Sequence, residues 1–192
     1  TKYTTSTSQA IRKWAGTALP SVYGSFGSNL RWKDLSLSML MTYSLGGKTM
    51  DGSYRSLMST GSASSAAALH KDVLNSWNGA PDGMTATSPN RIDPNGTPIL
   101  DFNGSNDNNA VSDRWLTSSS YFIMKNIMLT YRLPKALVTK WGLGGISVKA
   151  GVENLFTLTS RKGLNPQYSF NGDSDDTYVS ARVFNFGLTV DL

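Results

Sequence analysis

Apolar and polar residues alternate along five stretches of the chain, and this period of two predicts five β-strands. The expected strands cover about residues 21–32, 35–45, 121–133, 145–156 and 178–192. The last strand is the clearest, because alternate positions at the end of the chain are all apolar: Phe184, Phe186, Leu188, Val190 and Leu192. Such a strand has one apolar face and one polar face. The pattern alone does not decide whether the apolar face contacts a protein core or lipid.

The connections between the expected strands alternate in length. Lys33 and Asp34 alone join the first two strands, which indicates a tight hairpin. The second connection has no periodicity from Gly46 to Ser118, the third is compact, and the fourth, at 157–177, is long and acidic. Outer-membrane barrels show this alternation, because they have short periplasmic turns and long extracellular loops. The connections therefore favour a membrane barrel.

Three local signals add detail to this pattern. Pro134 and Gly142 bracket a short helix in the third connection, with the proline in its first turn. Residues 64–79, in the long second connection, combine good helix formers with a serine at the start and a glycine at the end, and predict another helix. Within the third strand the alternation changes phase near Lys125 and Asn126, as at a β-bulge.

Aromatic residues gather near both ends of the expected strands. Trp32 and Tyr131 fall at the end with the short turns, and the opposite end carries Tyr23, Tyr43, Tyr121, Phe156 and Tyr178. Membrane interfaces select two aromatic girdles of this kind. Aromatic residues are also common at strand ends in soluble β proteins, so a soluble β-sandwich that binds a ligand stays open as the alternative.

The composition excludes several classes of function. The chain has no cysteine and one histidine, His70, beside which no nucleophile or second carboxylate can be placed. The 18 Lys and Arg residues form no basic run longer than two residues, so the net charge of +5 does not indicate a nucleic-acid partner. Residues 101–109 are faintly similar to a calcium loop, but lack its glycine at the sixth position and its glutamate at the twelfth. We expect no enzyme, no cofactor and no bound metal.

Three segments, taken in order, resemble the C-terminal end of SusC-like TonB-dependent outer-membrane transporters. They are "SYFIMKNIMLTYRLP" at 120–134, "NLFT" at 154–157 and "YVSARVFNFG" at 178–187. The hairpin at 19–48 is similar to the preceding hairpin of the family. The chain departs from the family pattern at three places: Asn165-Pro166-Gln167 replaces Asp-Pro-Glu, Val179 replaces a proline, and Leu192 replaces a terminal aromatic residue.

This resemblance implies an all-β fold: about five C-terminal strands of a large antiparallel transmembrane β-barrel, 22-stranded in the family, with long extracellular loops. Residues 1–192 are then a C-terminal portion of the barrel domain without its plug domain, either a nicked fragment or a separate chain. Residues 46–118 are then a long extracellular loop with a short helix. The last strand closes the family's barrel with its apolar residues toward lipid.

The resemblance also implies a function and a set of partners. It indicates active import of a bulky nutrient, an oligosaccharide, glycan or peptide, across the bacterial outer membrane. The expected partners are the remainder of the barrel and the plug, a SusD-like surface lipoprotein that acts as a lid, TonB through the plug, and outer-membrane lipid.

Two groups of residues are candidates for contacts in such a transporter. Loop residues that combine aromatic rings with hydrogen-bonding groups are candidates for contact with substrate or lid: Trp77, Asn78, Asp101, Asn103 and Trp115. The alternative for each tryptophan is that it packs the loop together. Charged residues of the strands are expected to line the lumen: Arg132, Lys149, Glu153 and Arg182.

Overall fold

The computed structural model describes residues 7–59, 68–75, 109–168, 171–174 and 180–192. The chain forms two compact units, which we consider separately. Unit 1 comprises residues 1–15 and 50–116, and unit 2 comprises residues 16–49 and 117–192. No helix in the described ranges is long and apolar enough to cross a membrane.

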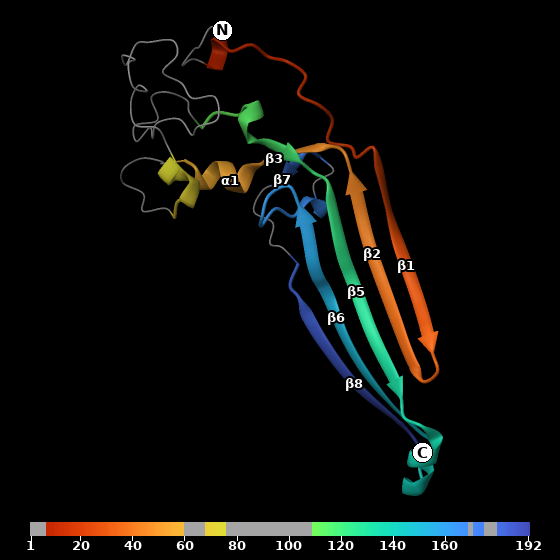
Figure 1. Cartoon of the computed structure of the whole chain (residues 1–192). Helices are drawn as coiled ribbons and strands as arrows, with labels where there is room; N and C mark the ends of the chain where they lie inside the picture. Colours follow the sequence, from red (N-terminus) through yellow and green to blue (C-terminus); the bar gives the residue numbers. More distant parts are fainter. Residues whose placement is uncertain (1–6, 60–67, 76–108, 169–170, 175–179) are drawn as a thin grey trace. The chain divides into compact units, whose positions relative to one another are not determined.

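Unit 2 contains an antiparallel sheet of five strands, which lie side by side in one layer (Figure 1). The strands are β1 (Val22–Trp32), β2 (Leu35–Leu45), β5 (Tyr121–Arg132), β6 (Gly145–Thr159) and β8 (Val183–Asp191), in the order β1-β2-β5-β6-β8. The five predicted strands are therefore confirmed, with β6 longer and β8 shorter than expected.

The connections at one end of this sheet are short and well defined. Lys33 and Asp34 form the predicted tight turn, with Lys33 at φ 53°. Between β5 and β6 the chain forms the predicted short helix, as α2 (Lys135–Val138) followed by the 3₁₀ helix η4 (Thr139–Trp141). Gly142 ends it in the left-handed conformation, at φ 72°, whereas Pro134 precedes the first turn instead of belonging to it.

The predicted phase change in β5 is a β-bulge that continues into β6. Leu40 and Met41 are consecutive on β2, but their partners on β5 are Asn126 and Met124, so Lys125 is an extra residue. On β6, Asn126 pairs with Glu153 and Met124 pairs with Phe156, which leaves two unpaired residues between Glu153 and Phe156. One of the two, Asn154, has φ 50°, and its side-chain amide donates to the Ala181 carbonyl (3.1 Å). Asparagine tolerates this conformation better than most residues do.

Several short elements have no counterpart in the sequence prediction. A second sheet, of order β4-β3-β7, consists of β3 (Lys48–Asp51), β4 (Leu116–Ser118) and β7 (Asp173–Ser174). Helix α1 (Gly52–Leu57) follows β3, and its first turn is capped by Asp51, whose carboxylate accepts from the Tyr54 amide (2.9 Å). The remaining elements are the 3₁₀ helices η1 (Thr7–Gln9), η2 (Lys71–Asn75), η3 (Asp113–Trp115) and η5 (Pro166–Tyr168).

The helix predicted at 64–79 was wrong in its described part. Residues 68–75 contain the 3₁₀ helix η2 and no α-helical turn, and the rest of the prediction lies outside the described residues. Good helix formers in a short segment do not fix its conformation, because most helical stability comes from packing. Here the packing is made by Val73, which contributes to the core of unit 1.

Candidate functional site

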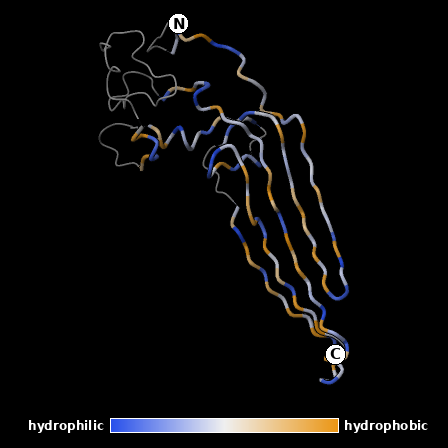
Figure 2. Tube along the Cα trace, in the orientation of Figure 1, coloured by the Kyte–Doolittle hydropathy of each residue, from blue (hydrophilic) through white to orange (hydrophobic). Residues whose placement is uncertain are grey.

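One face of the five-stranded sheet, which we call the apolar face, is hydrophobic from β1 to β8. The register shows this in a single row across all five strands, formed by Leu30, Leu37, Leu129, Ala150 and Phe186. The hydropathy of each strand alternates along its length, as Figure 2 shows. Residues at alternate positions of paired strands share a face, so the rows above and below repeat this character.

Side chains on the apolar face are uncovered within the described part of unit 2. Phe186 is 82% exposed, and Phe26, Leu30 and Leu188 are also exposed. A soluble monomer rarely leaves a continuous apolar patch of more than a few hundred Å² in contact with water. The apolar face therefore requires an apolar environment, which either lipid or another protein layer would supply.

The predicted apolar residues of the last strand lie on this face. Phe184, Phe186, Leu188 and Val190 pair with Val152, Ala150, Val148 and Ile146 of β6, all of them apolar. Leu192 follows the last residue of β8 and is fully exposed.

The opposite face, which we call the polar face, carries the charged residues of the strands. Arg132, Lys149 and Glu153, predicted to line a lumen, lie together on it by register. Glu153 accepts a hydrogen bond from the Asn185 side-chain amide of β8 (2.9 Å). The fourth predicted residue, Arg182, is exposed and precedes β8, so its face is not set by strand pairing.

The aromatic residues divide between the two faces. Trp32 and Tyr131 both pair with Leu35, so they lie in one row of the apolar face at the end with the short turns. At the other end Tyr43 pairs with Phe122 on the same face, and the Phe122 and Phe156 rings are 6.1 Å apart. These positions fit two interfacial girdles.

Two of the predicted girdle residues lie elsewhere. Tyr23 and Tyr121 both pair with Ser44, which places them on the polar face. Their level along the strands suits a girdle, but strand alternation turns each of them away from the apolar face. Tyr178 lies outside the described residues.

The loop after β6 contacts the sheet at the bulge. The Lys125 ammonium donates to the side-chain oxygen of Gln167, and the Gln167 amide nitrogen donates to the Asn165 side-chain oxygen (3.1 Å). Asn165 is buried, although a loop residue of this type is usually exposed. The segment Asn165-Pro166-Gln167 thus contacts the bulge through the Gln167 side-chain oxygen, at the position where the family pattern has a glutamate.

Unit 1 contains a small core around Trp115. Trp115 is 1% exposed and packs with Met58 and Val73, and its indole N–H donates to the Ala110 carbonyl (3.0 Å). The Arg114 guanidinium lies 4.5 Å from the centre of its ring, a cation–π distance. Trp115 therefore packs the loop together, which is the alternative role for this residue, and its ring is not open to a sugar or peptide.

Polar residues surround this core. The Tyr54 hydroxyl donates to the Asp72 carboxylate (2.9 Å), and the His70 ring meets the Tyr54 ring edge-on at 4.8 Å. The nitrogen Nδ1 of His70 accepts from the Asp72 backbone N–H (3.2 Å). Burial lowers the pKa of Arg114 below its usual value, and the nearby Tyr54 partly opposes this shift. The contacts tie α1 to η2.

In the described part of the chain, no three His, Asp or Glu residues gather into a group that could hold a metal ion. The other loop candidates, Trp77, Asn78, Asp101 and Asn103, lie outside the described residues, as does most of the segment that is faintly similar to a calcium loop.

The chain is similar to known transport receptors. It is 25% identical over 194 residues to TonB-dependent receptor P3 of Formosa agariphila, covering 95% of this chain and 17% of that receptor. It is 21% identical over 168 residues to TonB-dependent receptor P39 of the same organism, covering 83% of this chain and 14% of that receptor. The chain thus spans less than a fifth of the curated relatives it matches. No protein-family model matches it.

Solved structures show the same fold. The RagAB peptide importer in its closed-closed state matches with a TM-score of 0.70 at 24% identity, over 94% of this chain and 18% of that chain. Its open-open state matches with a TM-score of 0.67 at 22% identity, over 94% of this chain.

These likenesses agree with the resemblance read from the sequence motifs. The relatives are named as receptors and the structural neighbours as a peptide importer, and none is named as an enzyme. The predicted all-β fold is therefore confirmed, and the similarity to the two named receptors agrees with the predicted class, a TonB-dependent receptor of the outer membrane.

Proposed function

We propose that this chain supplies adjacent strands of a TonB-dependent outer-membrane barrel that imports a bulky nutrient, an oligosaccharide or a peptide. The observation that carries this proposal is the two-faced sheet. Its apolar face is continuous over five strands and ends on Phe186, which is 82% exposed. Antiparallel strands with one apolar face and one polar face are the architecture of barrels whose outside contacts lipid and whose inside contacts water.

In this barrel the polar face lines the lumen. Arg132, Lys149 and Glu153 then solvate the lumen and contact the plug, and Glu153 is oriented by Asn185. The remaining strands and the plug come from the rest of the transporter, because five strands do not close a barrel.

A SusD-like surface lipoprotein is the proposed lid, and residues 46–118 are the proposed extracellular contact with lid and substrate. Long loops on a rigid scaffold usually carry binding functions. The packed core around Trp115 supports this role, since it orders the ends of the segment and so limits the entropy lost on binding. Energy for release into the periplasm comes through TonB.

The rival function, a soluble β-sandwich module, requires a second sheet packed about 10 Å from the apolar face. Within the described part of unit 2 no second layer covers that face, since Phe26, Leu30 and Leu188 are all exposed. The two-faced sheet therefore favours the membrane barrel over the sandwich.

The test is deletion of residues 80–110 from the complete transporter in its host. We expect normal abundance in the outer membrane and loss of growth when the cognate glycan or peptide is the nutrient. Undiminished growth at normal abundance would contradict the role of the loop, and recovery of the transporter in a soluble fraction would contradict the barrel.

A further inference from the structure

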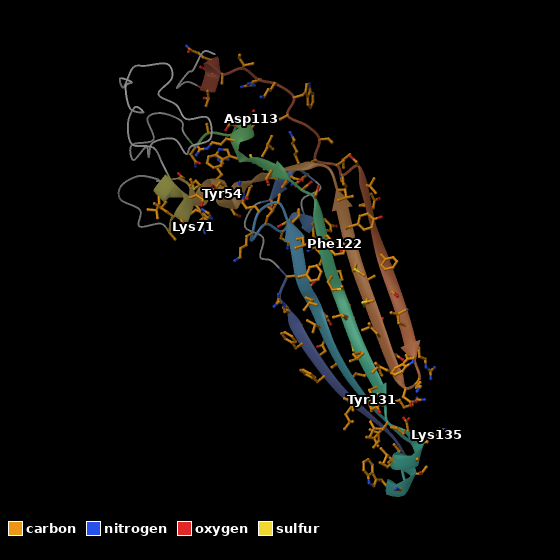
Figure 3. All side chains as sticks on the ribbon, viewed as in Figure 1. Tyr54, Lys71, Asp113, Phe122, Tyr131 and Lys135 are labelled. Atoms are coloured by element: carbon orange, nitrogen blue, oxygen red, sulfur yellow. The ribbon has the colours of Figure 1, made fainter. Side chains whose placement is uncertain are left out.

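Two turns at one end of the five-stranded sheet combine exposed aromatic rings with an excess of positive charge. They are residues 31–35 and 131–146, both of which are described in full. A hydrogen bond joins the two turns, because the Arg132 amide donates to the Asp34 carbonyl (2.9 Å). The second turn is also joined to the end of β8, where the Gly144 amide donates to the Asp191 carbonyl (2.8 Å). Figure 3 shows Tyr131 and Lys135 at this end and Phe122 at the other end of β5.

The helical turn α2–η4 has an apolar side that the sheet does not cover. Val138 is fully buried and anchors the turn, whereas Leu137 and Trp141 are exposed, Trp141 by 63%. Leu137 and Trp141 are four residues apart, so they lie on one side of the turn. On the hairpin, Trp32 is 69% exposed on the apolar face, and the Lys33 ammonium lies 5.1 Å from the centre of its ring.

Cationic residues outnumber carboxylates at this end of the sheet. The two turns carry five cationic residues, Arg31, Lys33, Arg132, Lys135 and Lys140, against two carboxylates, Asp34 of the hairpin turn and Asp191, which pairs with Gly145. Lys135 and Lys140 are exposed, and neither has an ion-pair partner in the described part of the chain. Exposed ammonium groups on the same turn as exposed apolar side chains match a ligand that is anionic at one end and apolar along its length.

We infer that the turn α2–η4, with the adjacent hairpin turn, is a binding site for the headgroup of an anionic phospholipid. The acyl chains lie on the apolar face beside Trp32, which is continuous with the turn. The headgroup phosphate lies between the ammonium groups of Lys135 and Lys140, and the Trp141 ring lies at the depth of the headgroup, where amphipathic rings are stable. This inference rests on the proposed function, since it requires the apolar face to contact lipid.

The experiment measures binding of phosphatidylglycerol to the complete, delipidated transporter in detergent. We expect phosphatidylglycerol to bind and to raise the unfolding temperature, and zwitterionic phosphatidylcholine to bind much more weakly. The double variant Lys135→Gln/Lys140→Gln should weaken phosphatidylglycerol binding by roughly 30-fold, since each lysine near an anionic lipid contributes about a factor of five. Trp141→Ala should weaken binding of both lipids.

The matched control is Lys162→Gln, which removes an exposed lysine beyond the other end of β6. It should leave phosphatidylglycerol binding unchanged. Equal binding by the parent and the double variant would overturn the inference, and competition by inorganic phosphate alone would show a phosphate site instead of a lipid site. Failure of the proposed function is distinguishable, because the transporter would then be absent from the outer membrane. If the parent transporter imports normally but the double variant binds phosphatidylglycerol as well as the parent does, only the lipid site is refuted.

Discussion

Ile127→Lys is the most direct test of which face of the sheet contacts lipid. Ile127 lies near the middle of β5, the central strand, and on the apolar face, where it pairs with Met39 and Val152. Its neighbour Asn126 lies on the polar face, opposite Glu153. The pair Ile127→Lys and Asn126→Lys therefore places the same charge at the same depth on opposite faces.

The geometry of β5 gives the expected magnitude. Phe122 and Tyr131, at the two ends of the apolar face of β5, are nine residues apart, or about 30 Å along a strand. A strand tilt of about 40° reduces this to roughly 23 Å along the membrane normal, close to the ~25 Å apolar band of outer-membrane barrels. Ile127 falls near its middle, where a lysine facing lipid costs about 2 to 4 kcal/mol.

Asn126→Lys should cost less than about 1 kcal/mol, because the new ammonium faces water and lies opposite the Glu153 carboxylate. The assay is denaturant unfolding of the complete transporter in detergent or liposomes, together with its abundance in the outer membrane. Equal losses for the two variants would show that lipid contacts neither face selectively. A larger loss for Asn126→Lys would show that the two faces are assigned the wrong way round.

Three further predictions follow from individual contacts. A Cβ on Gly151 would lie 2.8 Å from the Met128 methyl group, so Gly151→Val should destabilise the barrel by about 1 to 3 kcal/mol. Adding Met128→Ala should recover much of this loss, and no recovery would refute the contact. Trp115→Ala should cost about 3 to 5 kcal/mol within unit 1 and expose it to protease, while heat-modifiability on gels shows the barrel intact; unchanged protease resistance would refute its core role. Gln167→Glu should stabilise the loop by about 1 kcal/mol by giving Lys125 a charged partner, and Lys125→Met should abolish that gain; a gain that survives Lys125→Met would refute the pairing.

The sequence predicted the strands well because their information is local. In β2 the odd-numbered positions lie on one face of the sheet and the even-numbered positions on the other, so the face of each residue follows from its position. The tight turn at Lys33 and Asp34 fixes the register of the first hairpin. The bulge was also visible, since the alternation of β5 breaks at Lys125. The strands of the small sheet are two to four residues long, too short to show any period.

The candidate site was predicted less completely, for a physical reason. The burial of Trp115 depends on Met58 and Val73, which are distant in the sequence, so its neighbours in the chain give no sign that the ring is enclosed. One signal for helix α1 is present in the sequence, because Asp51 is a favourable N-cap residue immediately before the helix. The helix itself has only six residues, too few to show an amphipathic pattern.

The bulge also determines where β5 and β6 can change in length. Met124 and Asn126 lie on opposite faces although they are two residues apart, so deletion of Lys125 would restore regular alternation and leave every other side chain of β5 on its present face. Deletion of Met124 or Asn126 would also restore alternation, with Lys125 in the vacated place, whereas deletion of a residue far from the bulge would turn the side chains between the deletion and the bulge to the opposite face. In β6, Glu153 and Phe156 are three positions apart and lie on opposite faces, as regular alternation requires. Loss of Asn154 alone would therefore turn the side chains on one side of the deletion to the opposite face. Insertions and deletions among related chains should therefore concentrate at Lys125 and should occur at Asn154 and Leu155 only as a pair.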